Sequence, residues 1–561
     1  MLLRMMPTLP VALNSAHPSA AKLGVQCFRR LMAKKIIMNA PRMAPRAMAA
    51  TNISSFYSEN EDLTFSSMHG MEDSVAEALA AAGFTRPSIV QELASPVLMS
   101  GNDVVIAAET GSGKTLSYLA PIVSMLIRQK KRQAEAEKPL FFHAVVLCPN
   151  ATLCHQVVAV AKSLNASSPE GSPQISAAFI NSSNPPPLEA PDVVVATPAG
   201  LLNFIEGPGH SYGRLWTPDG MQARVRHVVL DEADLLMGRA YNKSVIELLS
   251  MLKSGDRRRV ESKIFEELGM MDEEFKRIPR RYQVAAWRGG TQGLLDAGFK
   301  PQVKPDPEAK YGPYWKRQYV FAAATMPSIT YSDAGSEINK LYPDAEWVCT
   351  DLLHQSKIKL EHTWVKVDDI TWQHELFTAI QEDPDYKAGT ARTLVFARDG
   401  ASAEELSERL DAAKIDHGVY HKSRPLADIN AALGMMRQPA DGKPRVLVCT
   451  DAAARGLDLP GVTHVIQADF APNAIDFLHR IGRTGRADSS GKVTSHYRDH
   501  NVPLVEVLQK FVEEGRPLET AFSRARSFSK KFKKSGGVFA PRGVARPAYD
   551  QAMRAPPPMD S

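Results

Sequence analysis

The chain of 561 residues is 44% apolar and 23% charged, with a formal net charge of +5. This composition is typical of globular proteins, so it excludes a wholly disordered, collagen-like or coiled-coil chain. No run of about 18 apolar residues occurs, so the sequence predicts neither a membrane-spanning helix nor a membrane partner.

Both ends of the chain are basic. Residues 1–58 contain eight basic residues and no acidic one, and residues 521–549 have the same counts. The remainder is therefore net acidic. The first segment is rich in Met, Ala and Pro and lacks the single apolar stretch of a secretory signal, which favours an organelle transit peptide. An ordinary extension is the alternative.

Short apolar runs separated by helical stretches recur along the middle of the chain. Such runs are typical of buried strands in parallel sheets that helices cover on both faces. They lie at residues 104–106, 144–147, 193–195, 228–230 and 319–321, and again at 393–396, 445–448 and 464–466. The sequence therefore predicts the α/β fold class, with a leader at 1–58, domains at 59–347 and 358–515, a linker at 348–357 and a tail at 516–561.

A long connection, residues 238–318, separates the last two predicted strands of the first domain. It contains the run Arg257-Arg258-Arg259 and is rich in Gly and Pro over residues 289–313. Connections of this length are usually surface insertions, so we expect an insertion that is partly helical and has no catalytic role.

A phosphate-binding loop follows the first predicted strand. Glycines let backbone N–H groups surround phosphate oxygens, and the N-terminus of a following helix favours negative charge. Lys114 is predicted to reach the β- and γ-phosphates of ATP, and Thr115 to bind Mg²⁺. Ala108 replaces the first Gly of the usual pattern. The loop that we expect to bind the nucleotide reads Ala108-Glu109-Thr110-Gly111-Ser112-Gly113-Lys114-Thr115.

An acidic quartet, Asp231-Glu232-Ala233-Asp234, directly follows the strand predicted at 228–230. P-loop ATPases hold Mg²⁺ with a carboxylate at the end of a neighbouring strand, so Asp231 is the candidate ligand. Glu232 is placed to orient and deprotonate the attacking water. The sequence thus predicts an ATP-hydrolysing site.

The quartet spells the signature of the DEAD-box RNA helicases, and the other motifs of that family follow in order. The chain resembles the family over about residues 65–500, which implies two RecA-like domains. The matching segments are Gly83-Phe84-Thr85-Arg86-Pro87-Ser88-Ile89-Val90-Gln91 with Phe65 upstream, Phe396-Ala397-Arg398, Thr450-Asp451-Ala452-Ala453-Ala454-Arg455-Gly456-Leu457-Asp458 and His479-Arg480-Ile481-Gly482-Arg483-Thr484-Gly485-Arg486.

The resemblance also implies roles for individual residues. Gln91 would read the adenine edge, Phe65 would stack on the ring, and Arg86 belongs to the same nucleotide-binding motif. Asp458 would lie near the ribose. On domain closure, Arg483 and Arg486 would stabilise charge on the γ-phosphate, so they join Lys114 and Glu232 as catalytic candidates. The residues implied to contact the RNA backbone are Pro149, Thr197, Pro198, Phe396 and Thr450.

Four departures from the family pattern concern RNA binding and coupling rather than ATP chemistry. Ala151 and the pair Ala199-Gly200 stand where motifs Ia and Ib carry Arg, and Ala323 stands where motif III carries Ser. Leu426 and Ile429 occupy the places of the Gln-x-x-Arg element. Either the protein is an active ATPase with a weaker hold on RNA and weaker coupling to unwinding, or its branch of the family repacks these motifs without consequence.

The basic tail, Arg524 to Lys534, includes Phe528 and Phe532, which suits an RNA-binding arm. A nuclear localisation signal and a plain solvated tail are the alternatives. The resemblance implies a monomeric ATP-dependent RNA helicase, most similar to a plant or algal plastid-type branch of the family. Its partners would be single-stranded RNA or short duplexes, bound through the backbone, and pre-ribosomal particles. The process would be ribosomal RNA maturation or ribosome assembly, and intron splicing is the second choice.

Other compartments and other activities remain open at this point. The mitochondrion, or the nucleus and cytoplasm, are the alternatives to the plastid. A nucleotide-gated RNA clamp, in which unwinding is incidental, and a DNA helicase are the alternative functions.

Overall fold

The computed structural model describes most of the chain between residues 56 and 518. Asp458 lies outside the described residues, and so does most of the predicted leader, of the predicted linker and of the basic tail. The described residues are 56–58, 60–134, 142–164, 173–238, 242–301, 316–326, 334–350, 353, 359–438, 441–454, 459–486, 489–516 and 518.

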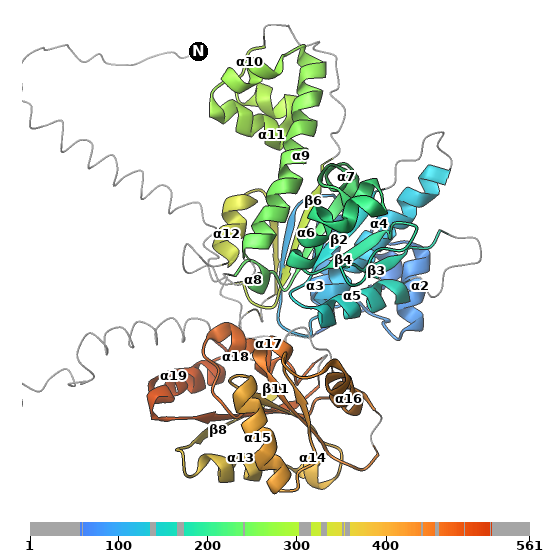
Figure 1. The fold of residues 1–561 in the computed structure, drawn as a ribbon. Coiled ribbons are helices and arrows are strands. Elements are labelled where there is room, and N and C mark those ends of the chain that lie inside the picture. The colour runs from blue at the N-terminus through green and yellow to red at the C-terminus, as the bar shows by residue number, and fades with distance from the viewer. Residues whose placement is uncertain are drawn as a thin grey trace, which may run out of the picture. The chain divides into compact units, whose positions relative to one another are not determined.

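The first domain contains a seven-stranded sheet, in the order β3-β4-β2-β5-β6-β1-β7, and every strand pair is parallel (Figure 1). All five predicted strands are confirmed. The sequence missed β3 and β7, which are short and only partly buried, so they lack a clear apolar run. The strands are β1 (Val104–Ala107), β2 (His143–Leu147), β3 (Ala177–Phe179), β4 (Val193–Ala196), β5 (Val225–Asp231), β6 (Gln318–Ala323) and β7 (Glu346–Cys349).

Helices cover both faces of this sheet, because alternate residues of each buried strand point to opposite faces. Val104 and Ile106 pack in one core with α3 (Ile89–Met99), α4 (Lys114–Ala134) and α5 (Ala151–Ser163). Val105 and Ala107 pack in the other. That second core includes α6 (Pro198–Glu206), α7 (Pro218–Arg224), α8 (Ala233–Leu236), α9 (Asn242–Leu268) and α12 (Ala334–Leu341). The shorter elements are η1 (Phe65–Ser67), α2 (Asp73–Ala81), η2 (Pro208–Tyr212) and η3 (Arg214–Trp216).

The second domain contains a six-stranded parallel sheet, in the order β10-β11-β9-β12-β13-β8. The three predicted strands, β9, β11 and β12, form its centre. The sequence missed the other three, among which β8 lies at one edge and is mostly exposed. The strands are β8 (Leu360–Lys366), β9 (Arg392–Ala397), β10 (Gly418–Tyr420), β11 (Arg445–Thr450), β12 (His464–Gln467) and β13 (Gly491–Tyr497).

Helices again cover both faces of the second sheet. One core includes α13 (Trp372–Gln381) and α15 (Gly400–Ala412), and the other includes α16 (Leu426–Arg437), α18 (Ala474–Ile481) and α19 (Val502–Glu513). The remaining elements are α14 (Pro384–Lys387), α17 (Asp451–Ala454) and η4 (Asp499–Asn501). The fold class predicted from the sequence is confirmed in both domains. In the described part of the chain, no helix has the length and apolar character needed to cross a membrane.

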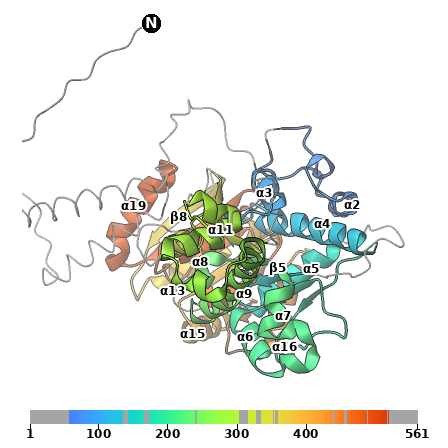
Figure 2. The same ribbon diagram turned by 90° about the horizontal axis from the view of Figure 1, so that it is seen from above.

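The predicted insertion forms a helical module. Its helices are the 27-residue α9, α10 (Asp272–Arg277) and α11 (Arg280–Asp296). Figure 1 shows α9 running out from the cover of the sheet towards α10 and α11, and Figure 2 shows α11 beside α9 from above. The module has a core of its own, built from Ile264, Leu268, Met270, Phe275, Ala286 and Leu294.

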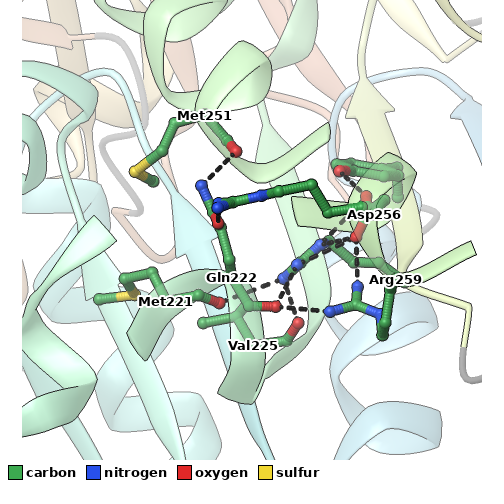
Figure 3. A network of polar contacts seen from close by, with 9 residues as sticks. Met221, Gln222, Val225, Met251, Asp256 and Arg259 are labelled. Carbon is green, nitrogen blue, oxygen red and sulfur yellow. Dashed lines mark hydrogen bonds and ion pairs between the residues drawn. The ribbon is translucent and has the colours of Figure 1, made fainter. Parts of the chain in front are cut away.

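A buried polar network ties α9 to α7 and β6 (Figure 3). Arg317 donates from Nε to Asp256 Oδ1 at 3.1 Å and from Nη2 to the Gln222 carbonyl at 2.8 Å. Its Nη1 donates to the carbonyl of Val225. Arg259 also donates to Asp256, at 2.5 Å. Because the side chain of Arg317 is 0% exposed, this network fixes α9 near its middle, at Asp256, through a buried charge.

Replacing Arg317 by Met is expected to destabilise the first domain by about 3–5 kcal/mol, because Asp256 and several carbonyls would lose a buried donor. The measurement is the urea unfolding midpoint of the full chain. Arg277→Met is the matched control, because the Arg277 side chain is 79% exposed and pairs only with exposed Glu273. A shift no larger than that of the control would contradict the anchoring role.

Candidate active site

The phosphate-binding loop connects β1 to α4, as the sequence predicts. Gly111 and Gly113 have φ angles of 73° and 92°, in the left-handed region that favours glycine. A Cβ atom on Gly113 would lie 2.5 Å from Gln91 Nε2, so this position has no room for a side chain. The loop leads into α4, a 21-residue helix whose N-terminal N–H groups suit phosphate.

Lys114 lies folded against this loop. Its Nζ donates to the carbonyl oxygens of Ala108 and Glu109, both at 2.8 Å. Burial lowers the pKa of Lys114, while the nearby charges of Glu109 and Asp231 oppose that shift. The ammonium group is thus held among carboxylates by weak acceptors that phosphate oxygens can replace.

The segment that resembles the family's adenine-binding motif forms hydrogen bonds to carbonyl groups of the phosphate-binding loop. Ser88 caps α3, and Gln91 Oε1 accepts from the Ser88 N–H at 2.8 Å. Gln91 Nε2 donates to the Gly113 carbonyl at 3.3 Å, and Ser88 Oγ donates to the Ser112 carbonyl at 2.8 Å. In this structure the Gln91 amide therefore hydrogen-bonds both to the phosphate-binding loop and to the residue that caps α3.

Two other residues of that motif lie apart from the loop. Phe65 is only 4% exposed and belongs to the hydrophobic core, so its ring presents no open stacking face in this structure. Arg86 donates from Nη2 to the Ser58 carbonyl at 2.9 Å. The adenine contacts of Phe65, Arg86 and Gln91 stay predictions.

Asp231 and Glu232 lie at the carboxyl end of β5. Asp231 accepts from the Tyr118 hydroxyl at 2.8 Å and from the Glu232 N–H at 3.0 Å. Burial, followed by the charge of Glu232, raises the pKa of Asp231 to about 6. Carboxylates crowded in a buried position suit a site that takes up a cation.

Glu232 has an unusual backbone. Its φ of 53° and ψ of 52° are left-handed, which is uncommon for a residue other than glycine and often marks a functional position. Its Oε2 is buried and has no hydrogen-bond partner among the residues that the structure describes. An acceptor oxygen of this kind is suited to bind a water molecule.

Asp234 joins the first domain to the motif around His479. The His479 Nε2 lies 3.1 Å from Asp234 Oδ2, and the Thr325 N–H donates to the same oxygen at 3.2 Å. The Thr325 hydroxyl donates to it as well. Burial alone would raise the pKa of Asp234, but the hydrogen bonds from His479 and Thr325 outweigh burial and lower it.

These contacts change the interpretation of the motif III departure. Ala323 is fully buried at the end of β6 and offers no hydroxyl. Thr325, two residues later, supplies a hydroxyl link between motif III and the acidic quartet. The Ser-to-Ala departure therefore does not disconnect the two motifs in this structure.

Replacing Thr325 by Val is expected to lower the duplex separated per ATP hydrolysed by about tenfold, because a hydrogen bond to a charged group contributes roughly 1.5–3 kcal/mol. ATP affinity should stay unchanged. The measurement is strand separation and phosphate release in the same reaction. Thr325→Ser, which keeps the hydroxyl, is the control, and equal ratios for both variants would contradict this link.

The second domain contributes the arginines that follow α18. Arg483 is 6% exposed and donates from Nε to the His479 carbonyl at 3.0 Å. Arg486 donates from Nε to the Gly482 carbonyl at 3.3 Å. Both guanidinium groups thus donate to carbonyls at the C-terminal end of α18, and their predicted contact with the γ-phosphate stays a prediction.

Arg480 has a structural role that the sequence did not reveal. It donates from Nε to Asp451 Oδ1 at 2.6 Å and from Nη2 to Asp451 Oδ2 at 2.7 Å. Its guanidinium lies 5.2 Å from the centre of the Phe396 ring and is 1% exposed. Arg480 thus holds three predicted motifs together. The only sequence signal for this role of Arg480 was its position in the motif His479 to Arg486.

The residues implied to contact RNA differ in what they can present. The side chains of Pro149, Pro198 and Phe396 are buried, so only their backbone could face a strand. The expectation of an RNA contact through the Phe396 ring therefore has no exposed surface in this structure. Thr450 ends β11 and is 7% exposed.

Motifs Ia and Ib each begin a helix. Asn150 caps α5 by accepting from the Leu153 N–H at 2.9 Å, and Thr197 caps α6 by accepting from the Gly200 N–H at 3.3 Å. Helix N-termini bind phosphate through free backbone N–H groups. The first domain therefore has a helix N-terminus at each of the two places where the family's arginines are missing.

Comparison with protein-family models gives two matches. Residues 88–265 match the model of the DEAD/DEAH box helicase, and residues 375–488 match the helicase conserved C-terminal domain. These segments contain the two sets of predicted motifs.

Among curated proteins, two plant relatives are similar over most of their length. The DEAD-box ATP-dependent RNA helicase 22 of Arabidopsis thaliana is 36% identical over 494 residues, covering 83% of this chain and 82% of the relative. The protein of the same name in Oryza sativa subsp. japonica is 37% identical over 505 residues, covering 85% of each.

Solved structures share the fold. Mss116p bound to single-stranded RNA and AMP-PNP has a TM-score of 0.56 and 18% identity, covering 82% of this chain and 79% of its own. Dbp5 of S. cerevisiae bound to RNA and ADP BeF3 has a TM-score of 0.56 and 17% identity, covering 83% and 99%. With two plant relatives matched over most of their length, the chain belongs to the DEAD-box ATP-dependent RNA helicases, which are ATPases.

Proposed function

We propose that the protein binds ATP and Mg²⁺ at the loop of residues 108–115 and a single RNA strand beside it, and couples hydrolysis to the separation of short duplexes. The observation that carries this proposal is the gathering of Lys114, Asp231, Glu232 and Asp234 at one edge of the sheet, with His479 bonded to Asp234. Residues from both domains thus meet at one carboxylate.

The residues present fit a magnesium site. Thr115 and Asp231 offer the hydroxyl and carboxylate oxygens that Mg²⁺ prefers, and a bound cation would oppose the burial and the Glu232 charge that raise the pKa of Asp231. When bound, Mg²⁺ would neutralise charge between the β- and γ-phosphates.

The side chains of this chain then divide the chemistry. Lys114 exchanges its backbone acceptors for phosphate oxygens. Glu232 orients a water and accepts its proton at the unpartnered Oε2. Arg483 and Arg486 leave the carbonyls of His479 and Gly482 and stabilise the charge that develops on the transferred group.

The RNA surface uses helix ends more than arginines. The N-termini of α5 and α6 present backbone N–H groups, whose contacts with phosphates carry no sequence information. The Mss116p and Dbp5 structures were solved with bound RNA, which supports an RNA strand here. A surface that lacks the two family arginines should show a shallow dependence of affinity on salt.

The experiment that tests this function compares RNA and DNA strands of one sequence. RNA is expected to stimulate ATP hydrolysis and to be separated from its complement, whereas DNA stimulates neither. Stimulation without strand separation would favour the RNA clamp, and equal stimulation by DNA would contradict RNA specificity.

We further propose that the protein acts on ribosomal RNA or pre-ribosomal particles in the plastid. The support is the basic leader predicted at 1–58 and the similarity to two plant relatives. Fusing residues 1–58 to a fluorescent protein tests the compartment, and crosslinking the protein to RNA in cells tests the substrate. Mitochondrial or nuclear fluorescence would contradict the plastid assignment.

A further inference from the structure

A polar cavity lies between the helical module and the first sheet, apart from the active site. Its volume is about 280 Å³, and it is lined by residues of α9 and α11 and by residues next to strand starts. Asp103 precedes β1, Lys316 precedes β6, and Asp344 precedes β7. Because the phosphate-binding loop follows the other end of β1, this cavity lies at the opposite edge of the sheet from the active site.

Positive charge dominates this cavity. Of its three acidic residues, Asp103 pairs with Lys316 at 3.5 Å and Asp344 pairs with Arg288 at 3.3 Å. The third, Asp256, pairs with Arg259 and Arg317, which lie outside the lining. The lining cations are Lys253, Arg257, Arg280, Arg288, Lys316 and Lys340.

Two of the arginines are available for a ligand. Arg257 and Arg280 are both exposed, and neither has an acidic partner within the described part of the chain. Arg280 donates from Nη1 to Gln283 Oε1 at 3.0 Å, which leaves its other N–H groups for a ligand. Lys253 differs, because its Nζ donates to the Leu341 carbonyl at 2.7 Å and lies 3.5 Å from the centre of the Tyr342 ring. The arginines therefore carry the recognition.

Trp287 holds these two guanidinium groups in place. The Arg257 and Arg280 groups lie 4.9 Å and 4.4 Å from the centre of its ring, and the ring itself is fixed by a 2.7 Å hydrogen bond from Nε1 to Glu261. A guanidinium stacked on an aromatic ring keeps its N–H edge free for two parallel bonds to phosphate. The cavity therefore presents oriented donors rather than loose surface charges.

We propose that this cavity is a second RNA site, which binds backbone phosphates of RNA that extends beyond the catalytic cleft. It goes beyond the proposed function, because it gives the first domain an RNA contact that needs neither ATP nor the second domain. An acidic protein segment fits less well. None of the large exposed apolar side chains of the described residues lines the cavity, and protein interfaces usually rely on such anchors.

The test compares two triple variants of the full chain. Arg257→Gln/Arg280→Gln/Arg288→Gln removes the cavity's arginines. Lys276→Gln/Arg277→Gln/Arg281→Gln removes three exposed charges of the same module outside the cavity. The measurement is binding of a fluorescent single-stranded RNA without nucleotide, between about 50 and 200 mM salt.

The cavity variant is expected to bind RNA about tenfold more weakly, with a salt slope smaller by about 1.4, because each of the two lost phosphate contacts on a single strand removes roughly 0.7. The control variant should keep the wild-type values. Equal affinities for both variants, or equal losses in both, would overturn the proposal. So would a cavity variant that loses affinity for a polyglutamate peptide but not for RNA.

Two further measurements keep the result interpretable. At saturating RNA the cavity variant should hydrolyse ATP at the wild-type rate. If RNA does not stimulate ATP hydrolysis by the wild-type protein, that result contradicts the proposed function and not the RNA site in the cavity. Arg280→Gln alone, at an exposed position, should weaken binding about threefold if the triple variant unfolds, and unchanged affinity would overturn the proposal.

Discussion

Replacing Glu232 by Gln is expected to slow ATP hydrolysis by about 10²–10⁴-fold, the usual contribution of a general base. Glutamine keeps the size of the side chain but cannot accept the proton of the attacking water. Because Oε2 of Glu232 has no hydrogen-bond partner among the described residues, its loss leaves the surrounding structure intact. The measurement is steady-state phosphate release at saturating RNA.

Binding should survive this change. ATP affinity and nucleotide-dependent RNA affinity are expected to stay near wild type, because Lys114 and the loop glycines are untouched. Glu266→Gln, at an exposed position of α9, is the matched control and should keep full activity. An active Glu232→Gln enzyme would remove this residue from the mechanism.

Replacing Arg480 by Met is expected to destabilise the second domain by about 3–5 kcal/mol. The change leaves Asp451 without its bidentate partner in a position where the arginine is 1% exposed. The measurement is urea unfolding followed by tryptophan fluorescence. Trp364 reports on this region, because its ring lies 6.0 Å from that of Phe477 at an interplanar angle of 5°.

A double-mutant cycle with Asp451→Asn separates the pair from general disruption. If the two side chains act through each other, the double variant should lose less stability than the sum of the single variants. Arg409→Met, on the half-exposed surface of α15, controls for loss of an arginine stem. Additive effects of Arg480 and Asp451 would contradict the pairing.

The centre of each sheet could be predicted from the sequence because its strands are continuous apolar runs. Val193, Val194 and Val195 are all fully buried, so nothing polar obscures the pattern. Only Leu360 of the edge strand β8 is buried, and its other residues are half-buried or exposed, so no apolar run marks this strand. The helical module was also underestimated, since its small core is built from residues scattered among charges.

Part of the candidate site could likewise be predicted from the sequence, and part could not. Its loop and its acidic quartet are contiguous in sequence, so their chemistry could be predicted. The bond between Gln91 and Gly113 and the pair of Arg480 and Asp451 join residues 22 and 29 positions apart. Such contacts depend on how helices pack, which no local pattern records.

The length of α9 has a mechanical consequence. Its 27 residues correspond to about 40 Å of continuous helix, and its first residue lies eight positions after Asp234. Because Arg317 holds the helix at Asp256, about 18 Å of α9 extends beyond that point, and a tilt of about 5° there would displace the outer end by about 1.6 Å. The buried network around Asp256 therefore sets where the outer end of α9 lies relative to the sheet, because the helix continues from that point to the core of the module.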